Sequence, residues 1–167
     1  MKNILFKIIE KFLRFHQHRK YKQYRTLYNL ADDFRFNGKE IQMYGKGKIL
    51  TGPKSYVGSY STLQSAEGDI ISIGSNCSIS HNVRMYTQSA KPDHDFNSKP
   101  LPQKNGDIII GNAVWIGANV FINPGVHIGD NAVIGANSVV TKNIEENAIY
   151  GGVPAKLIRY KRTSKAE

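Results

Sequence analysis

A histidine stands between two aspartates near the middle of the chain, in the run Asp93-His94-Asp95. A neutral imidazole can accept a proton from a hydroxyl group at neutral pH. A positioned general base of this kind is typically worth about 10²–10⁴-fold in rate. His94 is therefore a candidate general base, and Asp93 or Asp95 could orient its ring or contact a substrate. The alternative is a solvent-exposed loop histidine flanked by acids.

The segments on both sides of this histidine follow a six-residue period, which neither an amphipathic helix nor an alternating strand produces. One aliphatic residue recurs every six positions, namely Ile110, Ile116, Ile122, Ile128, Ile134 and Val140, and Ile73, Ile79 and Met85 keep the same phase. Four positions after each of the later six stand Val114, Val120, Val126, Ala132, Ser138 and Ile144. Glycine follows four of the six, and we expect it to supply the backbone angles of turns. Short strands joined by tight turns, three to a coil, fit this period and predict a parallel β-helix.

The period stops between Tyr86 and Asp107, and residues 87–106 form a long insertion. Loops of this length are uncommon inside a compact repeat unless they have a function. Insertions in solenoids often map to the binding face. His94 is the only histidine in the insertion, so we expect the loop to contribute to the site.

Composition excludes several classes of protein. The chain has 167 residues, of which 40% are hydrophobic and 22% charged, as in an ordinary globular domain. The sequence contains no run of about 18 apolar residues, and it therefore predicts no membrane-spanning helix. One cysteine excludes a disulfide framework and a multi-cysteine zinc site, and the position of Cys77 in its repeat predicts that it is buried. Because the other histidines lie far from His94 in the sequence, we expect no metal site.

The stretch from Gly111 to Arg159 resembles the hexapeptide-repeat acetyltransferases. It contains Gly-Asn-Ala-Val-Trp-Ile-Gly-Ala-Asn-Val, Asn-Pro-Gly-Val-His-Ile-Gly-Asp-Asn-Ala-Val-Ile-Gly-Ala-Asn-Ser-Val-Val-Thr-Lys and Gly-Gly-Val-Pro-Ala-Lys-Leu-Ile-Arg. The branch it resembles most comprises the galactoside, maltose and polysaccharide O-acetyltransferases, and the resemblance covers about residues 45–160. It implies an all-β, left-handed parallel β-helix, a homotrimer, acetyl-CoA as co-substrate, no required metal, and active sites between subunits.

The resemblance also implies roles for single residues. His94 matches the catalytic histidine of the long loop, and the N–H of Ala118 matches an oxyanion donor. The positions that match coenzyme contacts in the family are Trp115, Ala118, Ala136, Thr141, Lys142 and Arg159. The acceptor-binding coil departs from the family pattern, and Tyr60 and Gln64 are our candidates there. The acceptor therefore stays open.

The N-terminal segment raises a separate question. The net charge of the chain is +10, yet residues 1–25 contain eight basic side chains and one acid, Glu10. An apolar stripe predicts an amphipathic helix over residues 2–28, with Leu5, Ile8, Ile9, Phe12 and Phe15 at its centre and Ile4, Phe6 and Leu13 widening it. The helix could cap the solenoid or pack on another subunit, or it could contact an anionic membrane surface. The rest of the chain is only mildly basic, so we expect no nucleic-acid partner.

The predicted function is an acetyl-CoA-dependent O-acetyltransferase that acts on a sugar or a surface-polysaccharide precursor in the cytoplasm, at the inner face of the membrane if the helix binds there. Two alternatives on the same scaffold stay open, an N-acetyltransferase of an amino sugar and a xenobiotic acetyltransferase. A β-helix scaffold protein is the non-enzyme alternative. The expected segments are a basic helix at 1–30, the β-helix at 31–160 and a basic tail at 161–167.

Overall fold

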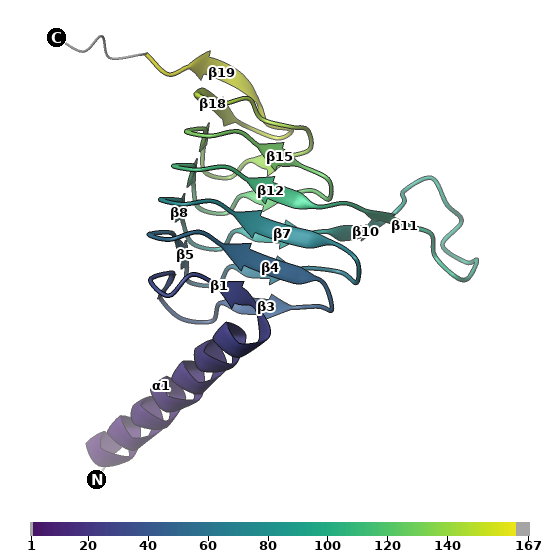
Figure 1. Cartoon of the computed structure of the whole chain (residues 1–167). Coiled ribbons are helices and arrows are strands. Elements are labelled where there is room, and N and C mark those ends of the chain that lie inside the picture. Colours follow the sequence, from purple (N-terminus) through teal and green to yellow (C-terminus); the bar gives the residue numbers. More distant parts are fainter. Residues whose placement is uncertain (1, 163–167) are drawn as a thin grey trace, which may run out of the picture.

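The computed structural model describes residues 2–162, with side chains from residue 4 onward, so residues 163–167 of the predicted tail lie outside it. Helix α1 (Lys2–Leu27) leads into a stack of short strands. The chain visits three parallel sheets in turn and completes five coils (Figure 1). The predicted parallel β-helix with an N-terminal helix is confirmed.

The three sheets form the sides of the solenoid. Sheet A contains β1 (Asn29–Leu30), β4 (Lys48–Thr51), β7 (Ile70–Ile73), β12 (Ile108–Ile110) and β15 (His127–Ile128). Sheet B contains β2 (Arg35–Asn37), β5 (Tyr56–Gly58), β8 (Ser78–Ile79), β13 (Trp115–Ile116), β16 (Val133–Ile134), β18 (Ala148–Gly151) and β19 (Lys156–Tyr160). Sheet C contains β3 (Gln42–Tyr44), β6 (Thr62–Gln64), β9 (Arg84–Tyr86), β14 (Phe121–Ile122) and β17 (Val139–Val140). All pairs in these sheets are parallel except β18 with β19, which closes the C-terminal end of sheet B.

The six-residue period marks the side chains that fill the interior. The aliphatic residues from Ile110 to Val140 in this period are at most 2% exposed. The residues four positions later are buried too, and Cys77, in the equivalent place of its own coil, is fully buried as predicted. The interior is therefore one continuous column of apolar side chains.

The turn residues correct one expectation. Positive φ angles fall on asparagines at the corners, among them Asn82, Asn119 and Asn137, and not on the glycines that follow the buried isoleucines. Asparagine tolerates this conformation because its short polar side chain bonds locally, and these three join in a ladder of amide hydrogen bonds of 2.9 and 3.0 Å. The glycines are needed for space, since a Cβ on Gly117 would lie 2.6 Å from the backbone N of Ala136.

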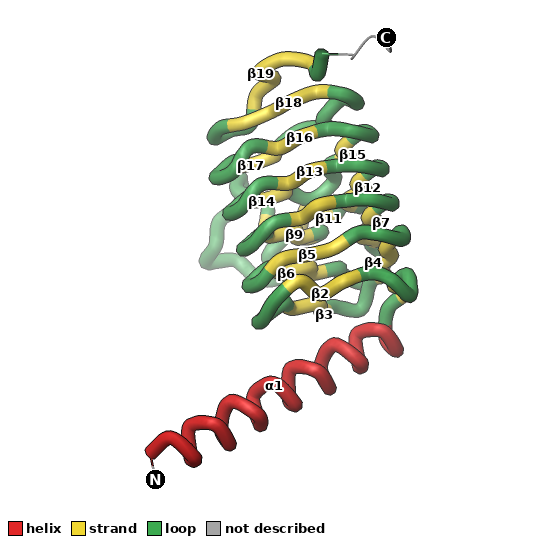
Figure 2. Tube along the Cα trace, turned by 90° about the vertical axis from the view of Figure 1, so that its left-hand side faces the viewer, coloured by secondary structure: helices red, strands yellow, loops and turns green. Residues whose placement is uncertain are grey.

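The C-terminal half of α1 covers the open end of the solenoid. The Tyr21 ring stacks on Phe36 with centroids 4.3 Å apart, and its hydroxyl donates to the Gly38 carbonyl at 3.0 Å. Tyr24 is buried beside them. The N-terminal half of α1 leaves the solenoid at an angle (Figure 2). Among the described residues, no helix is long and apolar enough to span a membrane.

Candidate functional site

The insertion at residues 87–106 is a hairpin that projects from the corner between sheets C and A (Figure 1). Its strands β10 (Gln88–Ala90) and β11 (Gln103–Asn105) pair antiparallel. The buried Thr87 holds the base of the hairpin. Its hydroxyl accepts the Ala66 N–H at 2.8 Å, and its carbonyl accepts the Gly106 N–H at 2.9 Å. The hairpin stem therefore holds the outer loop in a fixed direction relative to the solenoid.

His94 lies in the outer part of this hairpin. Its backbone N–H donates to the Pro92 carbonyl at 2.9 Å, and its ring meets Phe96 edge-on with centroids 6.4 Å apart. The Nε2 atom is shielded from solvent and has no hydrogen-bond partner among the described residues. A shielded polar atom without a partner is costly, and a ligand hydroxyl is one group that could supply the missing bond.

The neighbouring aspartates have different surroundings. Asp95 Oδ1 accepts both the backbone N–H and the side-chain amide of Asn97 at 2.9 Å. These bonds favour the charged carboxylate and lower the pKa of Asp95. Asp95 therefore closes a turn of the loop, while Asp93 is exposed to solvent.

Trp115 marks a second surface, on the outer face of sheet B. Its side chain is 57% exposed, and the strand register places Trp115, Val133, Ile149 and Arg159 in one row across β13, β16, β18 and β19. Three strand spacings separate the ends of this row by about 14 Å. The row can therefore contact an extended ligand that lies along the solenoid axis.

The corner between sheets B and C borders this row. Ala118 and Ala136 stack there in successive coils, and the Asn137 N–H donates to the Ala118 carbonyl at 2.8 Å. The Ala118 N–H donates to no acceptor within residues 2–162. Thr141 and Lys142 are exposed at the next corner, between sheets C and A, directly after β17.

One chain does not bring these predicted residues together. The hairpin with His94 projects on the side of the solenoid away from sheet B, as the two views in Figures 1 and 2 show. Trp115 and Arg159 lie on sheet B, whereas Lys142 lies at the corner between sheets C and A, the same edge from which the hairpin projects in an earlier coil. A site that combines His94 with the Trp115 row therefore needs residues from two chains.

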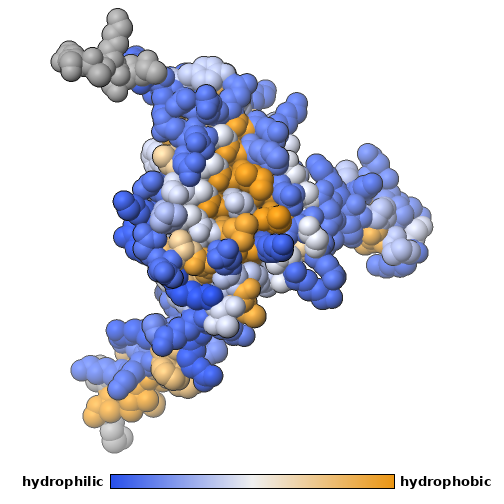
Figure 3. All heavy atoms as spheres, in the orientation of Figure 1, coloured by the Kyte–Doolittle hydropathy of each residue, from blue (hydrophilic) through white to orange (hydrophobic). Residues whose placement is uncertain are grey.

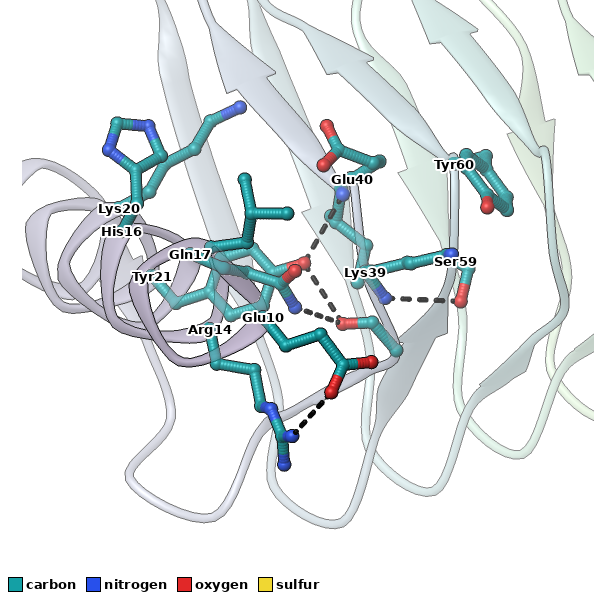
Figure 4. A pocket seen from close by; sticks show the side chains of 13 residues that line it. Glu10, Arg14, His16, Gln17, Lys20, Tyr21, Lys39, Glu40, Ser59 and Tyr60 are labelled. Atoms are coloured by element: carbon teal, nitrogen blue, oxygen red, sulfur yellow. Dashed lines mark hydrogen bonds and ion pairs between the residues drawn. The ribbon is translucent and has the colours of Figure 1, made fainter. Parts of the chain in front are cut away.

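The two candidates for acceptor binding, Tyr60 and Gln64, also lie apart from each other. Tyr60 lines a cavity of about 730 Å³ between α1 and the first coils, with the Lys39 ammonium 5.8 Å from its ring centroid (Figure 4). Gln64 ends β6, in register with Tyr44 and Tyr86 on sheet C. Its Oε1 atom is shielded and has no partner among the described residues, so Gln64, near the base of the hairpin, is the better placed of the two.

The outer face of sheet C also holds residues that the repeat pattern did not single out. Arg84 donates to the Thr62 hydroxyl at 2.6 Å and to Asn82 Oδ1 at 2.8 Å. Tyr86 stacks on Phe121 with centroids 5.5 Å apart. Arg84 and Tyr86 flank the buried Met85 immediately before the insertion. Their place next to the interruption of the period is the signal that could have identified them as candidate site residues.

Metal ligation and thiol chemistry find no support in this site. The described residues contain no group of three or more histidine, cysteine or acidic side chains that could hold a metal ion. Cys77 is buried in the solenoid, and this burial raises the pKa of its thiol. A raised pKa leaves little of the reactive thiolate at neutral pH.

A family model and individual sequence relatives were found for this chain. The family model described as bacterial transferase hexapeptide, with six repeats, matches residues 107–142. A polysialic acid O-acetyltransferase of Escherichia coli O1:K1 is 37% identical over 124 residues, which are 72% of this chain and 40% of that protein. A probable macrolide acetyltransferase of Lysinibacillus sphaericus is 43% identical over 110 residues, 55% of this chain and 61% of that one.

A solved structure extends the similarity to three dimensions. A hexapeptide-repeat acetyltransferase of Vibrio cholerae O1 biovar eltor, in complex with acetyl coenzyme A, superposes with a TM-score of 0.73 at 26% identity. The match covers 87% of this chain and 78% of that one. The two sequence relatives above are longer, and this chain spans less than two thirds of each.

Proposed function

The chain belongs to the hexapeptide-repeat acetyltransferases, and from that premise we propose that it transfers an acetyl group from acetyl-CoA to a hydroxyl of a sugar or glycan. The observation that carries the proposal is the match over 87% of the chain to a Vibrio cholerae acetyltransferase in complex with acetyl coenzyme A. The similarity to a polysialic acid O-acetyltransferase supports a glycan acceptor and polysaccharide synthesis. The single buried cysteine is in keeping with a cytoplasmic location.

In the proposed reaction, His94 Nε2 takes the proton of the acceptor hydroxyl while the oxygen attacks the thioester carbonyl carbon. The negative charge that develops on the carbonyl oxygen is stabilised by the free Ala118 N–H, as in other backbone oxyanion sites. The C–S bond then breaks, and the CoA sulfur takes the proton from the imidazolium. This direct transfer needs no acetyl-enzyme, in agreement with the burial of Cys77.

We assign the coenzyme to the Trp115 row, to the adjoining corner between sheets B and C, and to Thr141 and Lys142 at the corner between sheets C and A, which a second chain would bring to the row. Trp115 offers an exposed aromatic surface, and Ala118 and Ala136 form a corner without long side chains. Arg159 and Lys142 supply positive charge for phosphates, and Thr141 adds a hydroxyl. Asp93, Asp95 and Gln64, close to the hairpin, are assigned to the acceptor, with Tyr60 as the more distant candidate.

The proposed active unit is a homotrimer, in which His94 of one chain meets the Trp115 row of another. Two observations support association of the chains. His94 and Trp115 lie on different sides of one solenoid, and the outer face of sheet A carries an apolar patch that includes the partly exposed Leu50, Ile70 and Ile109 (Figure 3). Apolar patches of this kind often mark interfaces.

A xenobiotic acceptor is the second candidate. The 43% identity to a probable macrolide acetyltransferase favours a xenobiotic over an amino sugar as the second choice of acceptor. The xenobiotic and glycan candidates differ in the acceptor and share the coenzyme, so assays with polysialic acid, simple galactosides and macrolides distinguish them.

The first experiment is calorimetric titration of the protein with CoA and acetyl-CoA, followed by an assay of CoA release with a thiol reagent. The assay suits this chain because its only cysteine is fully buried. Binding in the micromolar range and acceptor-dependent thiol release are expected. A complete lack of binding at millimolar coenzyme would favour a scaffold protein over an enzyme.

The Lys142→Ala variant should bind CoA about tenfold more weakly than wild type, because one exposed charge-assisted contact to phosphate contributes roughly this much. Lys54→Ala is the matched control, since Lys54 is exposed at a corner of an early coil. Calorimetry on both variants checks the prediction. Equal loss in both would mean that the effect is one of net charge and not of a contact at Lys142.

A further inference from the structure

The first turns of α1 carry an apolar surface that is open to solvent. Eight large side chains there are between 47% and 66% exposed: Ile4, Leu5, Phe6, Ile8, Ile9, Phe12, Leu13 and Phe15. Figure 3 shows hydrophobic residues gathered toward the N-terminal end of the helix. Monomeric proteins rarely expose so many neighbouring apolar residues unless a partner or a membrane covers them.

The solenoid of the same chain leaves most of this surface open, and only Leu13, at the edge of the surface, lines the cavity against the first coils. At about 100° per residue, the eight side chains occupy an arc of roughly 200° around the helix axis. The centre of this arc is roughly 140° away from the side on which Tyr21, Tyr24 and Tyr28 pack against the solenoid. The helix therefore has two faces with separate roles, and the centre of the apolar arc points away from the side that packs against the β-helix.

The charges of α1 favour one occupant. Residues 1–25 contain eight lysines and arginines and one acid, Glu10, which is already paired with Arg14 at 3.6 Å. Lys7 and Lys11 border the apolar arc, where their long side chains can reach lipid headgroups. A second copy of the helix would bring the same positive charges face to face, and the arc is wider than a coiled-coil seam requires.

We propose that residues 4–15 of α1 bind an anionic lipid bilayer, with the apolar arc inserted at the level of the headgroups and the flanking lysines in contact with acidic lipids. The helix would lie in the plane of the membrane, since it cannot span it. The tyrosines of its C-terminal half keep the solenoid attached. This inference does not depend on the acetyltransferase activity.

The test is co-sedimentation of the full-length protein with vesicles of phosphatidylcholine alone and with one quarter phosphatidylglycerol. Wild type is expected to pellet with the anionic vesicles and to be released by 0.5 M salt. The double variant Ile8→Asp/Phe12→Asp should partition at least tenfold less, because two inserted side chains become charged. Val153→Asp is the matched control, since Val153 is 72% exposed on the described surface outside α1.

A second variant separates charge from apolar insertion. Lys7→Glu/Lys11→Glu should weaken binding to anionic vesicles by at least tenfold, since each basic residue near the surface contributes roughly fivefold. Unchanged thermal unfolding of the variants would show that the solenoid is intact. The proposal is overturned if wild type does not pellet with anionic vesicles, or if the Ile8/Phe12 variant pellets like the Val153 control. If wild type binds no lipid and the Ile8/Phe12 variant has a smaller oligomeric mass, the apolar arc belongs to a second copy instead.

Discussion

Replacement of His94 by alanine is expected to lower kcat by about 10²–10⁴-fold while the affinity for CoA stays nearly unchanged. The expectation rests on the Nε2 atom of His94, which is shielded and has no hydrogen-bond partner among the described residues. This histidine lies in a hairpin whose base is held by hydrogen bonds. Removing the imidazole removes the acceptor for the hydroxyl proton and about 3–5 kcal/mol of transition-state stabilisation. It removes no group that we assign to the coenzyme.

Steady-state kinetics and calorimetry on the same preparation check this prediction. His18→Ala is the matched control, because His18 is an exposed histidine of α1 that lies outside the apolar arc, the proposed site and the outer face of sheet A. Wild-type turnover in the His94 variant would remove the general base from the mechanism. Equal losses in both variants would point to a general effect of replacing histidine.

Replacement by alanine should affect stability at Ile116 and coenzyme binding at its neighbour Trp115. Ile116→Ala is expected to lower the free energy of unfolding by about 2–5 kcal/mol, because Ile116 is fully buried in the column and the change leaves a cavity. Trp115→Ala should change it by no more than about 0.5 kcal/mol, since the indole is 57% exposed. The tryptophan variant should instead bind CoA about tenfold more weakly.

Chemical denaturation and calorimetry on both variants separate the two effects. The isoleucine variant, where folded, should keep its CoA affinity, so each substitution acts as the control for the other. A destabilised Trp115→Ala with normal coenzyme binding would reassign Trp115 to packing against a neighbouring subunit.

The sequence predicted the interior of the solenoid better than its surface. Inward positions repeat every six residues because each coil must bury one aliphatic side chain per strand, and this requirement is local. Arg84 and Phe121 face outward, where no packing requirement imposes a period, and so they were not predicted. The asparagines at the corners were not predicted either, because glycine is the commoner residue at positive φ.

The candidate site was predictable only in parts. The interruption of the period identified the segment with His94, and the resemblance identified Trp115 and Lys142. Their distance from one another in one chain depends on which sheet each coil position joins, and therefore on the fold. The turn that Asp95 closes with Asn97 depends on side-chain directions in a loop, which no periodicity reports.

The hairpin insertion increases the sequence separation between two stacked strands, yet these strands pair in parallel like the others. Ile71 of β7 pairs with Ile108 of β12, 37 positions later, whereas Ile109 pairs with His127, only 18 later. Doubling a closed loop costs only about 0.6 kcal/mol of chain entropy. Evolution could therefore lengthen, shorten or replace this segment almost independently of the scaffold, and related chains with equal coenzyme surfaces could diverge in acceptor choice through this one loop.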